Sequence, residues 1–446
     1  MTTPSGAAVR RGWHRRIWKT AAPIMVSNLG LPVVGMVDTA LAGHLPGPEY
    51  LGGVGVAALI FSFTFWTFGF LRLSTTGYIA QAFGRGDREE LKAIVIRAAV
   101  IALVIAFALI VLQDPLRRLA LDLVEAGPLV SHQAALYFDV RIWAAPAVMG
   151  NFIVAGALIG LQRTGLALVV QAVIVTLNVG LDILFVPVLG WGVEGLAAAT
   201  AIAEGTGLAT GLVALVRALP EGRGPWPFGA ARIVKPYWPL LALNRDLLIR
   251  TLLLNVAFGV FISLSARIDD TTLAANEVLM MFLTFAAFAL DGFANACEAI
   301  VGEACGRRDP RMLREAVRVT FLWSGLTAVV VCLGYALGGE LLILLLTDIP
   351  EVRAEALAHV HYAILMPVIG VWSFQLDGIF TGAARGRDIR NAMVLAVVIY
   401  LPAIYLLHAE FGNDGLWLGL ALLFAVRALA LWRRYPGLAR DVAPAP

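Results

Sequence analysis

Six acidic residues lie inside long apolar stretches of the chain, where an ionised side chain is costly to keep. They are Asp38, Asp182, Glu204, Asp291, Glu298 and Asp377. A charge near the centre of a bilayer is rare, and it is usually found where a protein binds ions, relays protons or forms an internal pair. The chemistry to expect from these carboxyl groups is therefore reversible binding of a proton or a small cation, and no enzymatic reaction is predicted.

Helix depth predicts that Asp38 and Asp182 lie in one layer. The predicted helices that carry them both run outward, and each aspartate lies about five residues, or ~8 Å, before the outer end of its helix. Three neutral polar residues reach the same level. They are Tyr137, Asn178 and Thr200. The alternative is that the two aspartates are separate, each near the headgroups and each satisfied by a local donor.

Such a layer has a chemical use. Two neighbouring carboxyl groups removed from water can hold one proton near neutral pH and release it when a cation arrives. Hydroxyl and amide groups around them can re-form hydrogen bonds in each state. The same oxygens of Asp38, Asn178, Asp182 and Thr200 are an alternative Na⁺ site.

A secondary polar site is a further hypothesis for the remaining charges. Its candidates are Glu204, Asp291, Glu298 and Arg72. Glu204 lies mid-span and either relays protons or lines the cavity, or it pairs with a neighbouring helix. Asp291 and Glu298 share one helix face, and they either form a polar site or pair with Arg245 or Arg250; Glu298 is close enough to a helix end to be solvated instead. Arg72 is expected near a cavity or beside an acid.

The elements that must position these residues are membrane-spanning helices. The 446 residues are 59% hydrophobic and 15% charged, with a mean hydropathy of +0.81, whereas soluble domains carry about 25% charge. Apolar stretches of roughly 20 residues, the length that crosses a bilayer as a helix, recur along the chain. They are 17–43, 51–82, 93–112, 132–161, 165–188, 193–217, 241–265, 273–303, 315–337, 356–383, 388–409 and 415–433. This predicts an all-α integral membrane protein of twelve spans; an alternative count separates the apolar run 337–347.

The distribution of positive charge predicts the orientation. Most of the 34 Lys and Arg residues fall in alternate loops and at both ends of the chain. The intervening loops hold only Arg117, Arg118, Arg267 and Arg353. Because positive residues accumulate on the cytoplasmic side, both termini are expected there, in a bacterial inner membrane.

The chain repeats itself, and one constant offset relates its two halves. Gly84-Arg85-x-Asp87 recurs as Gly306-Arg307-x-Asp309, and at the same offset the pair Gly156 and Gly160 recurs as Gly378 and Gly382. Each half holds six spans, which predicts two pseudo-symmetric lobes of equal orientation, as in many secondary transporters. The predicted divisions are an N-lobe at 1–218, a Pro- and Gly-rich linker at 219–239 and a C-lobe at 240–446.

The two halves differ at the acid layer. The repeat offset places Ile404 and Tyr400 opposite Asp182 and Asn178, and an apolar stretch near Val260–Ile262 opposite Asp38. The paired acids are therefore predicted to exist in the first half alone. Pro23 and Pro32 are expected to kink the first span, which carries Asp38.

Several classes of function are disfavoured. The chain holds no GxxxxGK[ST] loop for direct coupling to ATP and no carbonyl-filter motif of a potassium channel. Its three cysteines have neither disulfide nor metal spacing. No cofactor or nucleic acid is expected, and the coupling ion is H⁺ or, alternatively, Na⁺.

Several motifs resemble one family. The sequence Gly35-Met36-Val37-Asp38-Thr39-Ala40 with Gly43-His44-Leu45 and Leu51-Gly52-Gly53-Val54 is similar to the start of multidrug and toxic compound extrusion (MATE) transporters. Three further segments resemble the DinF-like branch of this family. They are Phe70-Leu71-Arg72-Leu73-Ser74-Thr75-Thr76-Gly77, Asn244-Arg245-Asp246 and Ala289-Leu290-Asp291-Gly292-Phe293-Ala294.

The resemblance implies a V-shaped antiporter that exports organic, often cationic, drugs or metabolites in exchange for protons. Asp38 would be its proton site, with Tyr137, Asn178, Asp182 and Thr200 as companions. A Na⁺-site glutamate of another branch has no clear counterpart. The expected partners are small organic cations or amphiphiles and the lipid bilayer, with the protein a monomer. Alternatives are a flippase for lipid-linked or amphipathic substrates and a Na⁺-coupled exporter.

Overall fold

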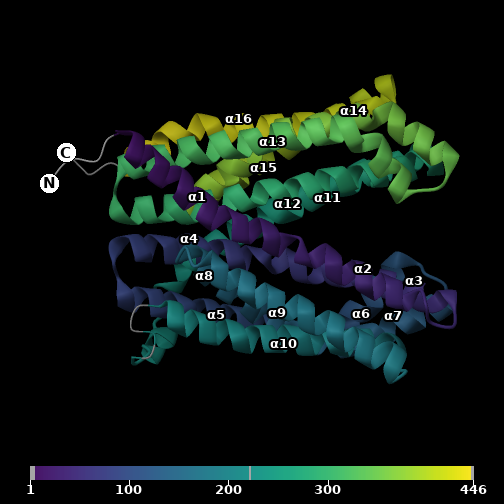
Figure 1. Ribbon diagram of the computed structural model, residues 1–446, viewed down its shortest axis with the longest axis horizontal. Helices are drawn as coiled ribbons and strands as arrows, with labels where there is room; N and C mark the ends of the chain where they lie inside the picture. Colours follow the sequence, from purple (N-terminus) through teal and green to yellow (C-terminus); the bar gives the residue numbers. More distant parts are fainter. Residues whose placement is uncertain (1–5, 220–221, 223, 443–446) are drawn as a thin grey trace. The chain divides into compact units, whose positions relative to one another are not determined.

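The computed structural model describes residues 6–219, 222 and 224–442, and these form helices joined by short loops, with no strand among them (Figure 1). The first ten helices are α1 (Gly6–Asn28), α2 (Gly30–Ala42), α3 (Pro48–Trp66), α4 (Phe70–Arg85), α5 (Arg88–Val111), α6 (Gln113–Val124), α7 (Pro128–Arg141), α8 (Ala145–Gly160), α9 (Thr164–Ile183) and α10 (Gly192–Ala218). The others are α11 (Tyr237–Ile268), α12 (Asp270–Arg307), α13 (Pro310–Leu346), α14 (Pro350–Gly382), α15 (Gly386–Phe411) and α16 (Asn413–Val442). Some residues lie outside the described part of the chain. They are 220, 221 and 223 of the predicted linker, and 1–5 and 443–446 of the predicted lobes.

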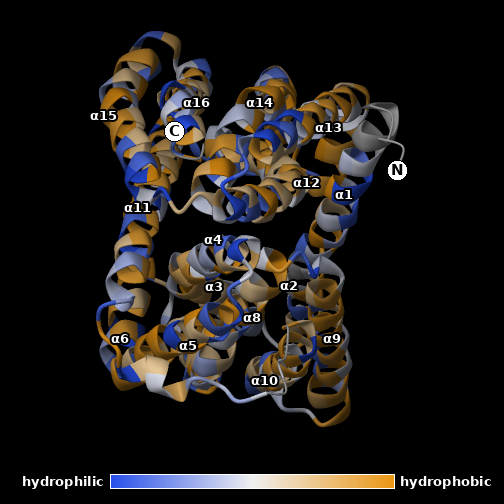
Figure 2. Cartoon of the chain, turned by 90° about the vertical axis from the view of Figure 1, so that its left-hand side faces the viewer, coloured by the Kyte–Doolittle hydropathy of each residue, from blue (hydrophilic) through white to orange (hydrophobic). Residues whose placement is uncertain are grey.

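Twelve helical segments of the described chain are long and apolar enough to cross a membrane, which confirms the predicted number. Three of them join two helices with little or no break: α1 with α2, α3 with α4 and α7 with α8. The alternative count is wrong, because α13 continues unbroken from Pro310 to Leu346 and contains nearly the whole run 337–347. Figure 2 shows apolar residues along the length of outer helices such as α9 and α15, as a lipid-facing surface requires.

The short helix α6 was not predicted. It lies between α5 and α7, and Leu119 and Leu123 on it are exposed. Arg117 on the same helix pairs with Asp139 of α7. The apolar residues of α6 are interleaved with charges and the helix has 12 residues, which is too short to span a bilayer.

The described chain forms two compact units. One unit runs from Val26 to Leu241, and the other joins the chain from Ala242 onward to the segment before Val26. The first part of α1 packs within this second unit: Arg16 pairs with Glu303, and the indole of Trp323 donates to His14 over 2.9 Å. The predicted N-lobe at 1–218 contains the whole of α1, so the units differ from the predicted domains in this segment.

The internal repeat is visible in the helix contacts. A Cβ added to Gly156 would lie 2.5 Å from the carbonyl oxygen of Arg72, so α8 and α4 touch backbone to backbone. The repeat offset relates the contacts Gly156–Arg72 and Gly160–Thr76 to Gly378–Ala294 and Gly382–Glu298. Glycine is required at these positions for a steric reason, because any side chain would push the two helices apart.

Gly156→Ala is therefore expected to destabilise the protein. The added Cβ meets a carbonyl of a neighbouring helix that cannot rotate away, and overpacking of this kind costs about 1–3 kcal/mol. The matched control is Gly325→Ala in α13, where nothing lies within 4 Å of an added Cβ. Thermal unfolding of the purified protein in detergent measures both. A melting temperature of Gly156→Ala at or above that of Gly325→Ala would contradict the packing argument.

Candidate functional site

Asp38 and Asp182 come together because α2 lies close against α9. The chain turns at Leu29, just before Pro32, whose ring supplies no backbone N–H to the preceding turn. Directly after this turn, Gly30 brings the backbone of α2 so near α9 that an added Cβ would lie 2.9 Å from the Val175 side chain. This approach carries Asp38, two turns further along α2, to the buried face of α9 that holds Asp182.

The two carboxyl groups interact directly with each other. Asp182 is fully buried, and Asp38 is 9% exposed. Their side chains lie within hydrogen-bonding contact. Both oxygens of Asp182 and Oδ1 of Asp38 are buried and accept no hydrogen bond from another described side chain. Because two ionised carboxylates are both acceptors, this contact becomes a hydrogen bond only when one of them carries a proton.

The three neutral companions join the same layer. The Asn178 amide donates to the Thr200 hydroxyl over 3.0 Å, and that hydroxyl donates to the Leu196 carbonyl oxygen over 2.9 Å. Tyr137 contacts Thr200, and Asp38 and Asp182 act electrostatically on its hydroxyl. All three are buried. The structure therefore brings together all five residues predicted for the site, from α2, α7, α9 and α10.

An arginine that was not predicted for the site lies beside it. Arg141 ends α7, one helical turn after Tyr137, and acts electrostatically on both Asp38 and Asp182. Its guanidinium lies over the ring of Phe61, 5.5 Å from the centroid, and 6.0 Å from that of Tyr137. A spacing of four residues places side chains on one helix face, so the position of Arg141 relative to Tyr137 could have indicated it.

Glu204 lies near this layer with a different partner. The Asn151 amide of α8 donates to its carboxylate over 2.6 Å and to its backbone carbonyl over 3.0 Å. Arg141 also acts on Glu204 electrostatically. Glu204 thus has a partner on a neighbouring helix, and this partner, Asn151, was not predicted.

The second half lacks the acids at the matching positions. Tyr400, the counterpart of Asn178, donates its hydroxyl to the Ala257 carbonyl oxygen over 2.9 Å. Ile404, the counterpart of Asp182, is fully buried with Phe261 in an apolar core. At these two positions the second half thus has a packed tyrosine and isoleucine in place of the amide and carboxyl groups of the first.

A family model for MatE matches the chain twice, at residues 23–184 and 247–406, which together exceed half of it. The chain belongs to the MATE family. The DNA damage-inducible protein F of Escherichia coli is 39% identical, over 94% of this chain and 92% of that protein. A probable multidrug resistance protein NorM of Bradyrhizobium diazoefficiens is 28% identical, over 95% of this chain and 93% of its own length. As a member of the MATE family, the chain is a transporter rather than an enzyme.

Solved structures share the fold of this MATE protein. The Vibrio cholerae MATE transporter VcmN matches with a TM-score of 0.86 and 20% identity, over 97% of this chain and 98% of that one. A MOP superfamily transporter from Pyrococcus furiosus matches with a TM-score of 0.87 and 17% identity, over the full length of both chains. The comparison confirms the predicted architecture: a MATE multi-pass membrane transporter of twelve helices, built from two related halves.

The acids of the C-terminal unit are placed differently from those of the first half. Asp377 of α14 pairs with Arg427 of α16 and with Arg250 of α11, the latter over 2.5 Å. Asp291 acts electrostatically on both arginines, and Arg250 is one of its two predicted partners. Arg245 instead pairs with Asp246. Asp377 is thus neutralised by arginines.

The remaining members of the predicted secondary site are divided between the two units. Glu298 is 1% exposed, so it is not a solvated residue at the helix end. Arg72 is half-buried on α4, and the cation that acts on Asp38 and Asp182 is Arg141 instead. Glu204 and Arg72 belong to the first unit, and Asp291 and Glu298 to the second.

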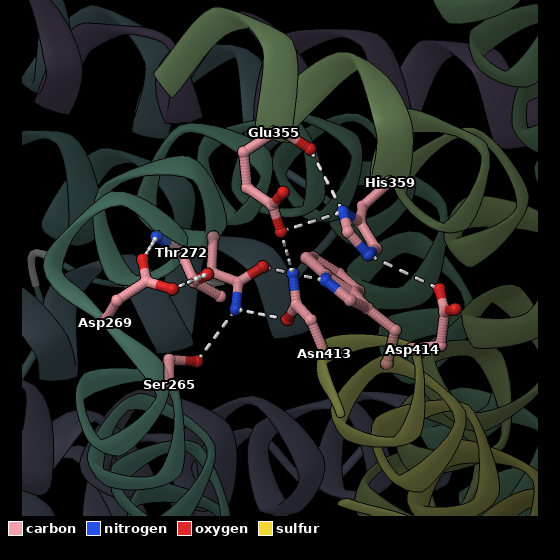
Figure 3. A network of polar contacts seen from close by, with 9 residues as sticks. Ser265, Asp269, Thr272, Glu355, His359, Asn413 and Asp414 are labelled. Carbon is pink, nitrogen blue, oxygen red and sulfur yellow. Dashed lines mark hydrogen bonds and ion pairs between the residues drawn. The ribbon is translucent and has the colours of Figure 1, made fainter. Parts of the chain in front are cut away.

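A second polar network joins four helices of the C-terminal unit (Figure 3). Asn276 of α12 lies at its centre: its amide donates to Ser265 of α11 over 2.8 Å and to Asn413 of α16 over 2.7 Å. The Trp417 indole donates to its oxygen over 2.9 Å. Glu355 of α14 accepts from Asn413 over 3.2 Å. Each of these hydrogen bonds links two helices of the C-terminal unit.

Asn276→Ala is expected to lower the stability of this unit. The change removes three hydrogen bonds and leaves the Trp417 indole without its acceptor, which costs about 2–4 kcal/mol in total. Asn391→Ala, at an exposed amide of α15, is the matched control. Thermal unfolding in detergent measures both variants. Equal melting temperatures would show that the network contributes nothing to stability.

Proposed function

We propose that this MATE protein exports small organic cations from the cytoplasm in exchange for protons that bind at Asp38 and Asp182. The observation that supports the proposal is the direct contact of two buried carboxyl groups that receive no hydrogen bond from other described side chains. Such a pair is stabilised by one bound proton, and it gains a strong attraction for a cation when the proton leaves. Proton binding and cation binding at the pair therefore exclude each other, as exchange requires.

The neighbouring groups support the same assignment. Asn178, Thr200 and Tyr137 form a chain of neutral hydrogen-bonding groups beside the pair, and they can change partners when the proton moves. The break between α1 and α2 lies in the span that carries Asp38. Solved relatives of this fold include bent and straight conformations of MATE, so movement of this span upon protonation is part of the proposal.

The charges of the C-terminal unit favour a cationic over an anionic substrate. A flippase for anionic amphiphiles needs positive side chains that are open to the substrate. Arg250 and Arg427 lie within the spans, but each is paired with Asp377. The distribution of Lys and Arg between loops supports a plasma-membrane orientation with both termini in the cytoplasm.

Transport in proteoliposomes tests the proposal. The purified protein is reconstituted, and pH and Na⁺ gradients are imposed separately over a panel of fluorescent organic cations and amphiphiles. The expected result is that the pH gradient alone drives uptake of at least one cation against the concentration gradient of that cation. Transport driven by Na⁺ alone, or restricted to anionic amphiphiles, would overturn it.

A further inference from the structure

The acid layer of the N-terminal unit contains many oxygen atoms, and these would also suit a sodium ion. Asp38, Asp182 and Asn178 each hold at least one buried oxygen that accepts no hydrogen bond from another described group. Sodium, like other hard cations, binds carboxylate, amide and hydroxyl oxygens. Oxygen ligands alone therefore do not explain why the site would take protons rather than Na⁺.

Arg141 adds a fixed positive charge to this layer. It acts electrostatically on the Asp38 and Asp182 carboxyl groups, on the Tyr137 hydroxyl and on Glu204. It forms no direct ion pair with any of these acids, and its Nη1 is buried without a hydrogen-bond partner among the described residues. The guanidinium is held instead by the faces of aromatic rings, chiefly that of Phe61.

This arrangement affects the binding of Na⁺ and of protons differently. A carboxyl pair that shares one proton carries a single negative charge, and Arg141 compensates it. A Na⁺ ion, by contrast, must bind a pair whose attraction is already reduced by a permanent cation. The same charge also opposes the proton, but a proton forms a covalent O–H bond and a short hydrogen bond between the two carboxyl groups, so its much stronger binding persists where weak Na⁺ binding is lost.

We propose that Arg141 is a specificity-determining residue that keeps Na⁺ out of the Asp38–Asp182 site and so makes the site selective for protons. The inference rests on the proposed proton-coupled function. It assigns Arg141 no contact with the transported compound. Its role is to set the charge of the layer, and Phe61 is the residue that positions it.

Sodium binding to the purified full-length protein tests the inference without any transport measurement. Wild type, Arg141→Gln, Arg141→Met and Arg141→Lys are titrated with NaCl against choline chloride at constant ionic strength, with binding of radioactive sodium as the readout. We expect the Gln and Met variants to bind Na⁺ roughly 100-fold more tightly than wild type, about 2.8 kcal/mol at about 1.4 kcal/mol per factor of ten. One unit charge at close range in a protein interior has an effect of this size. The Lys variant keeps the charge and should resemble wild type.

The controls separate this inference from the proposed function. Arg117→Gln, an arginine of α6 that pairs with Asp139 on the same unit, should leave Na⁺ binding unchanged. If Arg141→Gln is poorly folded, Arg141→Met retains the apolar stem over Phe61, and Phe61→Leu should also strengthen Na⁺ binding by loosening the guanidinium.

Folded Gln and Met variants that bind Na⁺ no better than wild type would overturn the role of Arg141. Wild-type transport driven by Na⁺ alone would instead overturn the proposed function.

Discussion

Asp38→Asn is expected to abolish proton-driven export. Asparagine has the size of aspartate and keeps a hydrogen-bonding group beside Asp182, but it cannot bind and release a proton. An ion shifts a conformational equilibrium only through a difference in its affinity for the two states. Without the Asp38 proton this difference is lost, and cation transport under a pH gradient should fall at least about tenfold, to the level of protein-free vesicles.

The measurement is efflux of a fluorescent organic cation in proteoliposomes under an imposed pH gradient. Asp114→Asn is the matched control, because Asp114 is an exposed aspartate of the same unit, with 69% of its side chain accessible. A melting temperature of the purified Asp38 variant close to that of wild type in detergent separates loss of coupling from loss of folding. Wild-type transport by Asp38→Asn would refute the assignment of the proton site.

The sequence predicts much of this site because helix geometry is regular. A rise of about 1.5 Å per residue is enough to place Asp38 and Asp182 in one layer from the ends of their helices. The constant offset between the two halves is enough to predict that Ile404 replaces Asp182 in the second. Both predictions depend on the position of a residue along its helix. Neither requires knowledge of the rotation of that helix about its axis.

Residues whose placement depends on rotation and packing cannot be found in this way. The spacing of four residues from Tyr137 could have indicated the helix face of Arg141, but the sequence does not show that its guanidinium packs on Phe61. Asn151 could not be predicted either, because an amide in an apolar stretch does not indicate which residue it will hydrogen-bond. The docking of the first part of α1 against α12, through Arg16 and Glu303, involves residues 287 positions apart, which no local pattern connects.

Asp377→Ala is expected to have the largest effect on stability. Arg427 is 1% exposed and pairs with Asp377 inside the C-terminal unit. Removal of the carboxylate leaves that guanidinium, and Arg250 beside it, without its direct ion-pair partner in a medium of low dielectric constant. Breaking a buried pair from one side in this way costs about 3–5 kcal/mol.

The double variant Asp377→Leu with Arg427→Leu distinguishes this cause from a simple loss of packing. It removes a buried charge of each sign and refills the space with apolar atoms, and such replacements are often neutral or even stabilising. We therefore expect the melting temperature in detergent to fall sharply for Asp377→Ala and to recover in large part in the double variant. Asp377→Leu alone also refills the space but leaves the charge of Arg427 uncompensated, so it should remain unstable if that charge, rather than lost packing, is the source of the instability. A double variant as unstable as the single one would show instead that the ion pair itself, rather than the avoidance of a buried lone charge, holds α14 to α16.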